Sequence, residues 1–266
     1  MNAPEKYFLP DIQASADGRC LAIQHVGVAG IRYPIQLATS AGETVTTVAT
    51  LAMTVGLPSE VKGTHMSRFV EVLESPRAAL DAPGLLAMLD EMLHRLDARD
   101  GRIEMRFPYF IAKTAPVSGV ASLLDYDVTL RAEQPAAGPA RVTLQVTAPV
   151  TSLCPCSKEI SDYGAHNQRS NITLEARLRG PMSIEALVRL AEEEASCEVF
   201  GLLKRPDEKW VTERAYDNPK FVEDLVRDIA LRLMREPAIA AWKVVSENFE
   251  SIHNHSAYAE LSGENA

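Results

Sequence analysis

Long runs of alternating apolar and polar residues dominate the chain and predict β-strands. The clearest is ETVTTVATLAMTVGL at 43–57, where threonine alternates with valine, leucine or methionine over much of the run. Successive side chains of a strand point to opposite faces, so this pattern is typical of a strand buried on one side only. Similar runs occupy 20–39, 102–115, 121–133, 140–151, 168–179, 241–252 and 256–261. Turn-forming residues separate the runs between 102 and 151, which predicts an antiparallel meander.

Three segments carry apolar residues at helical spacing. One covers 83–99 behind Pro83, and a second covers 183–196, where Ser183 is a suitable N-cap. The third, at 218–236, has a cap, a proline in its first turn and an apolar stripe, and is predicted to be the strongest helix. The polar segment RPDEKWVTE has no such spacing, and we expect a loop there.

The order of these elements is strands, helix, strands, helices, strands. It favours an α+β fold with antiparallel sheets and suggests two similar halves. We expect an irregular arm over 1–18, a first unit over 19–150, and a second unit over 151–266 that carries most of the functional residues. No repeat is evident residue by residue.

Composition narrows the class of partner. The 266 residues carry a net charge of −9, so general attraction to nucleic acid or to an anionic membrane is not expected. No window has the eighteen or more apolar residues of a membrane span, and the N-terminal residues lack an apolar signal core. Four cysteines do not make a disulfide framework. We therefore expect a cytoplasmic protein whose thiols are reduced.

The segment TSLCPCSKEISDYGAHNQRS at 151–170 concentrates groups that bind metals or transfer protons. Cys154 and Cys156 are too close for a zinc-finger or thioredoxin spacing. In an extended loop their side chains would point the same way, but the intervening proline strains chelation of one metal by both thiols. We expect one metal ligand and one reactive or hydrogen-bonding thiol, with burial of both as the alternative.

Other polar clusters leave two interpretations open. ENFESIHNHS ends in a histidine pair beside Glu250, which is either part of a transition-metal site or a solvated strand end. VKGTHMSRF either cradles phosphates or is ordinary surface charge. Glu223 needs no function, because acids are favoured in the first turn of a helix. We expect Cys20 and Cys197 in the core and Glu192–Glu194 on a solvated helix face.

The motifs PVTSLCPCSKEISDYGAHNQRS, KGTHMSRF and ENFESIHNHSAYA closely resemble the prokaryotic type IB GTP cyclohydrolase I family, over about residues 20–262. This resemblance implies the tunnelling fold, in which antiparallel sheets with helices on one face assemble side by side into barrels. It also implies a homotetramer with two fused units in each chain and active sites between subunits. The implied reaction converts GTP and water to 7,8-dihydroneopterin triphosphate and formate, the entry step to folate and to deazaguanine tRNA modification.

The resemblance also implies roles for individual residues. One divalent metal (zinc, manganese or iron) is expected in each site, with Cys154, Glu208, Glu250 and His253 as ligands. Cys156 is expected near the purine, with His166 and His255 as proton shuttles. Glu223 is expected to anchor the guanine, and this role replaces its interpretation as an acid that is merely favoured in the first turn of a helix. The expected triphosphate contacts are Lys62, His65, Arg68, Lys158, Arg169 and Ser170.

Two rival functions are weighed against this one. A relative with the same fold reduces a nitrile with NADPH through a nucleophilic cysteine and needs no metal. A non-catalytic purine- or pterin-binding protein would bind GTP without releasing formate. The Glu250, His253 and His255 cluster favours the cyclohydrolase over the reductase.

Overall fold

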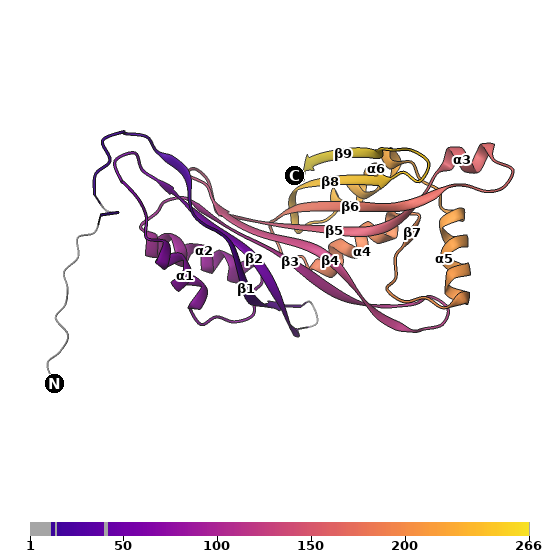
Figure 1. Ribbon diagram of the computed structural model, residues 1–266, viewed down its shortest axis with the longest axis horizontal. Coiled ribbons are helices and arrows are strands. Elements are labelled where there is room, and N and C mark those ends of the chain that lie inside the picture. The colour runs from indigo at the N-terminus through magenta and orange to yellow at the C-terminus, as the bar shows by residue number, and fades with distance from the viewer. Residues whose placement is uncertain (1–11, 14, 40–41, 266) are drawn as a thin grey trace.

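The computed structural model describes residues 12–13, 15–39 and 42–265, and most of the predicted arm over 1–18 lies outside this part. The strands form one antiparallel sheet in the order β1-β2-β3-β4-β5-β6-β8-β9, with the short β7 beside β5 (Figure 1). Their bounds are β1 Ile23–Ala38, β2 Thr44–Leu57, β3 Gly101–Thr114, β4 Ala121–Gln134, β5 Arg141–Leu153, β6 Asn167–Leu178, β7 Cys197–Glu198, β8 Ile239–Phe249 and β9 Ser256–Glu264.

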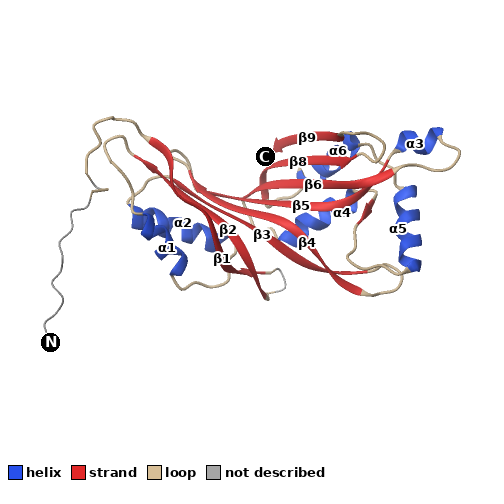
Figure 2. Cartoon of the chain, viewed as in Figure 1, coloured by secondary structure: helices blue, strands red, loops and turns tan. Residues whose placement is uncertain are grey.

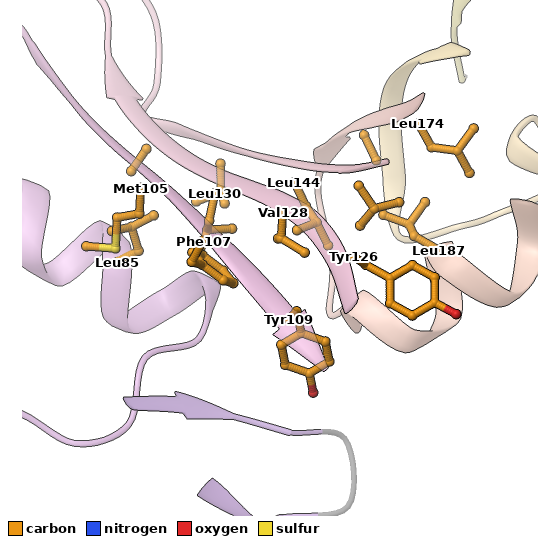
Figure 3. Close-up of a cluster of buried hydrophobic side chains, with 14 of the residues drawn as sticks. Leu85, Met105, Phe107, Tyr109, Tyr126, Val128, Leu130, Leu144, Leu174 and Leu187 are labelled. Atoms are coloured by element: carbon orange, nitrogen blue, oxygen red, sulfur yellow. The ribbon is translucent and has the colours of Figure 1, made fainter. Parts of the chain in front are cut away.

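Every predicted strand is present, because the alternation that predicts it is the alternation of burial. In β2 the odd-numbered residues from Thr47 to Leu57 are buried, and their neighbours are half-buried or exposed. The register carries this face across the sheet: Met105 pairs with Leu130, and Leu130 with Leu144. These three side chains lie within the cluster of buried apolar residues drawn in Figure 3.

Helices cover that apolar face in two groups, as Figure 2 shows. Contacts place α2 (Ala82–Leu96) against β3, β4 and β5, and α1 (Met66–Glu74) against α2. In the other group, α4 (Ile184–Glu194) packs on β5 and β6, and α6 (Val222–Leu233) packs on β8 and β9. Ser183 caps α4 as predicted, accepting a hydrogen bond from the Ala186 N–H at 3.2 Å.

Three sequence expectations about helices need correction. The predicted loop around RPDEKWVTE is wrong, since Arg205–Asp217 forms the helix α5. The expected extended segment at Cys154–Cys156 is also wrong, because Pro155–Ile160 forms the short helix α3. The predicted helix over 218–236 is shorter at both ends, and Pro219 precedes it. The helix α1 is not predicted from the sequence.

The two halves share one sheet and one core. Residue 150, the expected end of the first unit, lies inside β5, which pairs with β4 on one side and with β6 on the other. A single cluster of buried apolar side chains includes residues of α1, α2, α4 and α6. Cys197 lies in a small satellite cluster, as expected of a buried thiol, whereas Cys20 is exposed and its predicted core position is wrong.

The opposite face of the sheet carries no described helix, and its side chains are largely polar or half-buried. Glu104 is an example: it accepts hydrogen bonds from Arg106 of the same strand and from Arg131 of the adjacent strand β4. Burial disfavours its charge, but these arginines hold the pKa of its carboxyl below the usual range. Among the described residues no helix is long and apolar enough to cross a membrane.

Candidate active site

The ends of β6 and β8 bring His166 and Glu250 together. His166 lies immediately before β6 and Glu250 immediately after β8, and these strands pair with Ser170 opposite Asn248. The His166 Nδ1 is 3.9 Å from a Glu250 carboxylate oxygen, and both side chains are largely buried. An imidazole beside a carboxylate, here where β6 begins and β8 ends, is suited to proton transfer or to metal binding.

Two further polar groups surround the same imidazole nitrogen. The His166 Nδ1 lies 3.0 Å from the Gln168 side-chain oxygen and 3.4 Å from the Ser251 hydroxyl. An amide oxygen only accepts, so this contact favours the tautomer with the proton on Nδ1. The other ring nitrogen is then left as the basic atom. Sequence reasoning missed Gln168, because its role depends on a contact that no motif encodes.

The Cys-Pro-Cys segment is joined to His166 through the backbone. The Cys154 N–H donates to the His166 carbonyl, and the His166 N–H donates to the Ser157 hydroxyl, both at 3.2 Å. Cys154 is the N-cap of α3, and its sulfur accepts from the Ser157 N–H at 3.5 Å. Cys154 is therefore half-buried beside His166, whereas Cys156 is exposed in the first turn of α3. The two thiols have different environments.

The predicted triphosphate contacts near α3 also differ in exposure. The Lys158 ammonium donates to the Tyr216 carbonyl at 2.5 Å and lies 4.3 Å from the centroid of the Tyr216 ring, so it links α3 to α5. Arg169 is exposed at the start of β6. Ser170 is fully buried and donates to the Ser152 hydroxyl at 2.8 Å, so the structure does not bring it to the surface of the site.

Helix α5 carries the predicted metal ligand Glu208 in its first turn, exposed to solvent. Its neighbour Asp207 is completely buried and accepts from the N–H groups of Val117 and Ser118 and from the Ser118 hydroxyl. A further bond comes from the Lys204 N–H. Burial disfavours the charge, but these donors hold the pKa of the Asp207 carboxyl well below its usual range. Asp207 thus fixes the start of α5, and with it Glu208, to the β3–β4 hairpin.

The remaining predicted residues of the second half are exposed. Glu223 is in the first turn of α6, two residues after the N-cap Phe221. His253 and His255 lie in the turn between β8 and β9, and their rings stack with centroids 5.1 Å apart. The two histidines therefore project together, as the sequence suggested, but from a turn that is exposed to solvent.

The predicted phosphate contacts of the first half are far from these groups. Lys62, His65 and Arg68 lie in or just before α1, and Figure 1 shows α1 and α3 at opposite ends of the molecule. The Arg68 guanidinium donates to the Arg95 carbonyl at 3.0 Å. One chain thus divides the predicted site residues into two groups.

The donor types at the β6–β8 end suit a divalent metal, since they include a thiol, an imidazole and carboxylates. The geometry of a single chain is less complete. Among the residues that the structure describes, no three histidine, cysteine, aspartate or glutamate side chains cluster closely enough to hold an ion. The residue types therefore fit a divalent metal, and His166 links two of them, because it lies beside Glu250 and its carbonyl accepts from the Cys154 N–H.

Solved structures with the same architecture place the protein in a fold class. Uricase from Arthrobacter globiformis aligns with a TM-score of 0.53 at 9% identity, covering 91% of this chain and 93% of that one. Urate oxidase from Bacillus subtilis 168 gives a TM-score of 0.52 at 9% identity over 91% and 98% of the two chains. The protein is thus an α+β antiparallel-sheet protein with the T-fold of urate oxidases, built from two fused units.

The family follows from the sequence. Residues 9–259 match the family model described as type I GTP cyclohydrolase folE2, and the chain belongs to this family. GTP cyclohydrolase FolE2 1 of Dechloromonas aromatica is 76% identical over 263 residues, which cover 99% of each chain. GTP cyclohydrolase FolE2 2 of Cupriavidus metallidurans is 63% identical over 253 residues, or 95% of this chain and 94% of that protein.

Proposed function

We propose that this protein is a GTP cyclohydrolase, which hydrolyses GTP at C8 of the purine, releases formate and forms 7,8-dihydroneopterin triphosphate. The observation that carries the proposal is the family match over residues 9–259, within which lies the cluster of Cys154, His166 and Glu250. This reaction is proposed to be the first step of folate synthesis and of deazaguanine tRNA modification.

The chain's own residues supply the proton transfers that this reaction needs. Ring opening and loss of formate require a group that takes up and returns a proton near neutral pH, which suits an imidazole. His166 is held by Gln168 so that one nitrogen stays available. His255 is proposed as a second shuttle, and the exposed Cys156 thiol as the group nearest to the purine.

Substrate recognition is assigned to two kinds of group. Glu223 is proposed to accept hydrogen bonds from the N1–H and the 2-amino group of guanine, because a carboxylate matches that pair of donors. The triphosphate is proposed to contact Lys62, His65, Arg68, Lys158, Arg169 and Ser170, of which the buried Ser170 has the weakest support. Local clusters of basic side chains would bind GTP despite the net charge of −9 of the whole chain.

A divalent ion, zinc, manganese or iron, is proposed to be held by Cys154, Glu208, Glu250 and His253. When bound, such an ion would lower the pKa of a water molecule to about 7. The thiol ligand requires a reduced cysteine, which supports a cytoplasmic location. The chain's contribution is to hold Cys154 at the α3 cap and Glu250 beside His166.

The active form is proposed to be a homotetramer in which sheets close into barrels and sites form between subunits. Among the described residues, β9 pairs on one side only, and the outer edge of β1 carries only an isolated bridge between Leu37 and Leu80. The unpaired N–H and C=O groups of such edges can pair with a strand of another chain. The separation of Lys62, His65 and Arg68 from the α3 end supports the same arrangement, since a second chain would supply the missing basic group.

The decisive experiment incubates the purified protein with GTP and Mn²⁺, Zn²⁺ or Fe²⁺, and measures formate and, after oxidation, pterin fluorescence. We expect both products from the native protein, a large loss with His166→Ala, and little change with His94→Ala, an exposed histidine on α2. Binding of GTP without formate release would support a non-catalytic binding protein. Activity that survives chelation and consumes NADPH with a nitrile would support the reductase instead.

A further inference from the structure

A cavity lies on the helix-covered side of the sheet, and its lining includes none of the residues proposed to bind GTP. Its volume is about 540 Å³, and its walls come from the end of β3, α4, the segment 195–200 and α5. Pockets that bind small molecules are commonly about 300–1,000 Å³. The cavity is therefore large enough for a molecule of one or two rings.

The floor of the cavity is a buried ionic network. Lys113 is only 8% exposed, and its ammonium lies 2.7 Å from a Glu192 oxygen and also pairs with Glu198. The Tyr126 hydroxyl donates to Glu192 at 2.6 Å. Burial and this carboxylate raise the pKa of the Tyr126 phenol far above its usual range, so it remains a donor. The charged groups of the floor thus all have partners.

The two other acids of the lining are also satisfied. Glu185 accepts from the Tyr109 hydroxyl, and Glu193 pairs with Arg232 at 2.7 Å. Tyr109 and Tyr126 belong to the neighbouring strands β3 and β4, and Tyr126 lies close to Leu187 of α4 (Figure 3). The lining therefore presents no carboxylate without a partner to an incoming cation.

The two arginines of the lining are different. Arg189 on α4 and Arg214 on α5 are both exposed, and neither makes a hydrogen bond or an ion pair with any residue in the part of the chain that the structure describes. A guanidinium presents a planar fork of donors that matches carboxylate, sulfonate or phosphate oxygens. The charged groups of the lining that have no partner are thus both positive, and they lie on the two helices that line the cavity.

The rest of the wall is apolar and partly aromatic. Phe200 lies with its ring 4.8 Å from the Lys113 ammonium, and Trp210 of α5 is 36% exposed. Val188 and Ile111 complete this surface. Aromatic side chains of this kind pack well against a flat ring.

We propose that this cavity binds a small organic anion with a flat apolar body, whose acidic group pairs with Arg189 and Arg214 while its rings pack on Trp210 and Phe200. The site shares α5 with the candidate active site, because the Tyr216 carbonyl at the end of that helix accepts from Lys158. A ligand in the cavity thus contacts the helix that carries Glu208. The proposal does not depend on the GTP cyclohydrolase activity.

The test uses two probes that differ in charge: 8-anilinonaphthalene-1-sulfonate, and the neutral N-phenyl-1-naphthylamine. Trp242→Phe leaves Trp210 as the sole tryptophan, so energy transfer to the probe reports this cavity. We expect one sulfonate probe bound per chain, with quenching of Trp210. Arg189→Gln combined with Arg214→Gln should weaken its binding by at least about tenfold, since two charge-assisted hydrogen bonds are lost.

Arg235→Gln is the matched control, because Arg235 is an exposed arginine outside the cavity. It should leave the affinity unchanged, and the neutral probe should bind native protein and double variant alike. Trp210→Leu should weaken both probes. Thermal unfolding checks that each variant is folded. Equal affinity of the sulfonate probe for native and double-variant protein would overturn the proposal, as would equal affinity of native protein for the two probes.

Discussion

The His166 imidazole nitrogen Nδ1 lies 3.9 Å from a carboxylate oxygen of Glu250, because the antiparallel pairing of β6 and β8 places the start of one strand beside the end of the other. The Cys154 cap is bonded to the same histidine through its backbone. This relationship defines the centre of the proposed site.

Gln168 should act as a positioning residue for His166. Gln168→Met removes the acceptor 3.0 Å from Nδ1 while keeping the bulk of the side chain. We expect kcat for GTP to fall about tenfold, since one hydrogen bond contributes about 0.5–1.5 kcal/mol, with little change in KM. Nitrogen-15 NMR of the labelled imidazole should show a mixture of tautomers in place of one.

Gln168→Glu restores an acceptor and should return the ring to a single tautomer. Gln145→Met is the control, because Gln145 lies on β5 and points to the face of the sheet opposite to that of Gln168. It should change neither kcat nor the spectrum. An unaltered tautomer in the Gln168→Met variant would remove the positioning role.

The two thiols should respond differently to substitution. Cys154→Ala is expected to lose the metal, whereas Cys156→Ala should keep the metal and lose turnover, because only Cys154 is half-buried beside His166. Metal analysis of protein purified without chelator provides the measurement. Cys20→Ala, at an exposed thiol elsewhere, should change neither quantity. Equal metal loss in both site variants would mean that the roles are divided wrongly.

Glu223 should contribute to substrate binding more than to turnover. Glu223→Gln is expected to raise the Kd for GTP about tenfold or more, because hydrogen bonds to a charged group contribute about 1.5–3 kcal/mol. Equilibrium titration with a non-hydrolysed analogue gives the value. Asp224→Asn is the matched control from the same helix turn, where the carboxylate already pairs with Arg227 at 3.1 Å. Equal effects of the two changes would reduce Glu223 to a helix-terminal acid.

Mixed oligomers should recover activity if the site is shared between chains. Lys62→Ala and His166→Ala are each expected to be inactive alone, because each removes a residue proposed for the site. Within one chain Lys62 lies near α1 and His166 near α3, at opposite ends of the molecule. After unfolding and refolding together, about a quarter of the sites should contain both native residues, for random mixing across a twofold interface. Formate release measures this recovery. A mixture as inactive as its components would place each site within one chain.

Asp207 should stabilise the fold through its charge. Asp207→Asn is expected to lower the free energy of unfolding by about 1–3 kcal/mol at pH 7, because it disrupts a buried set of hydrogen bonds. The folded-state pKa of Asp207 is lowered, so its stabilisation is complete above the unfolded pKa near 4 and is lost as the pH falls.

The difference between native and variant protein should therefore shrink in acid, as measured by urea unfolding across this pH range. Asp217→Asn, at the exposed end of the same helix, should change stability by no more than about 0.5 kcal/mol. A constant difference down to pH 2 would show that the charge itself does not matter.

The sheet could be predicted because burial in it has a local period of two residues. Helix α5 could not, since only Asp207 and Ala215 are buried along it and no apolar stripe marks it. Its position depends on distant hydrogen bonds to the β3–β4 hairpin. Sequence reasoning therefore found Glu208 as a candidate ligand but not the element that carries it.

Long-range pairing also decides which charges are buried. The sequence suggested that Glu192 lies on a solvated face, and this was wrong, because Lys113 and Tyr126 reach it from two strands. The motif residues Cys154 and His166 were found from the sequence, being near one another along the chain. That Glu250 joins them follows from the β6–β8 register, which a single sequence does not reveal.

The continuity of β5 across residue 150 limits how this chain can be divided. A cut between residues 150 and 151 would pass through a strand that pairs on both sides, and would leave two fragments with incomplete sheets and exposed core residues. The two fused units are therefore mutually dependent within this chain. Selection can still alter each half, but we expect neither to persist as a gene of its own.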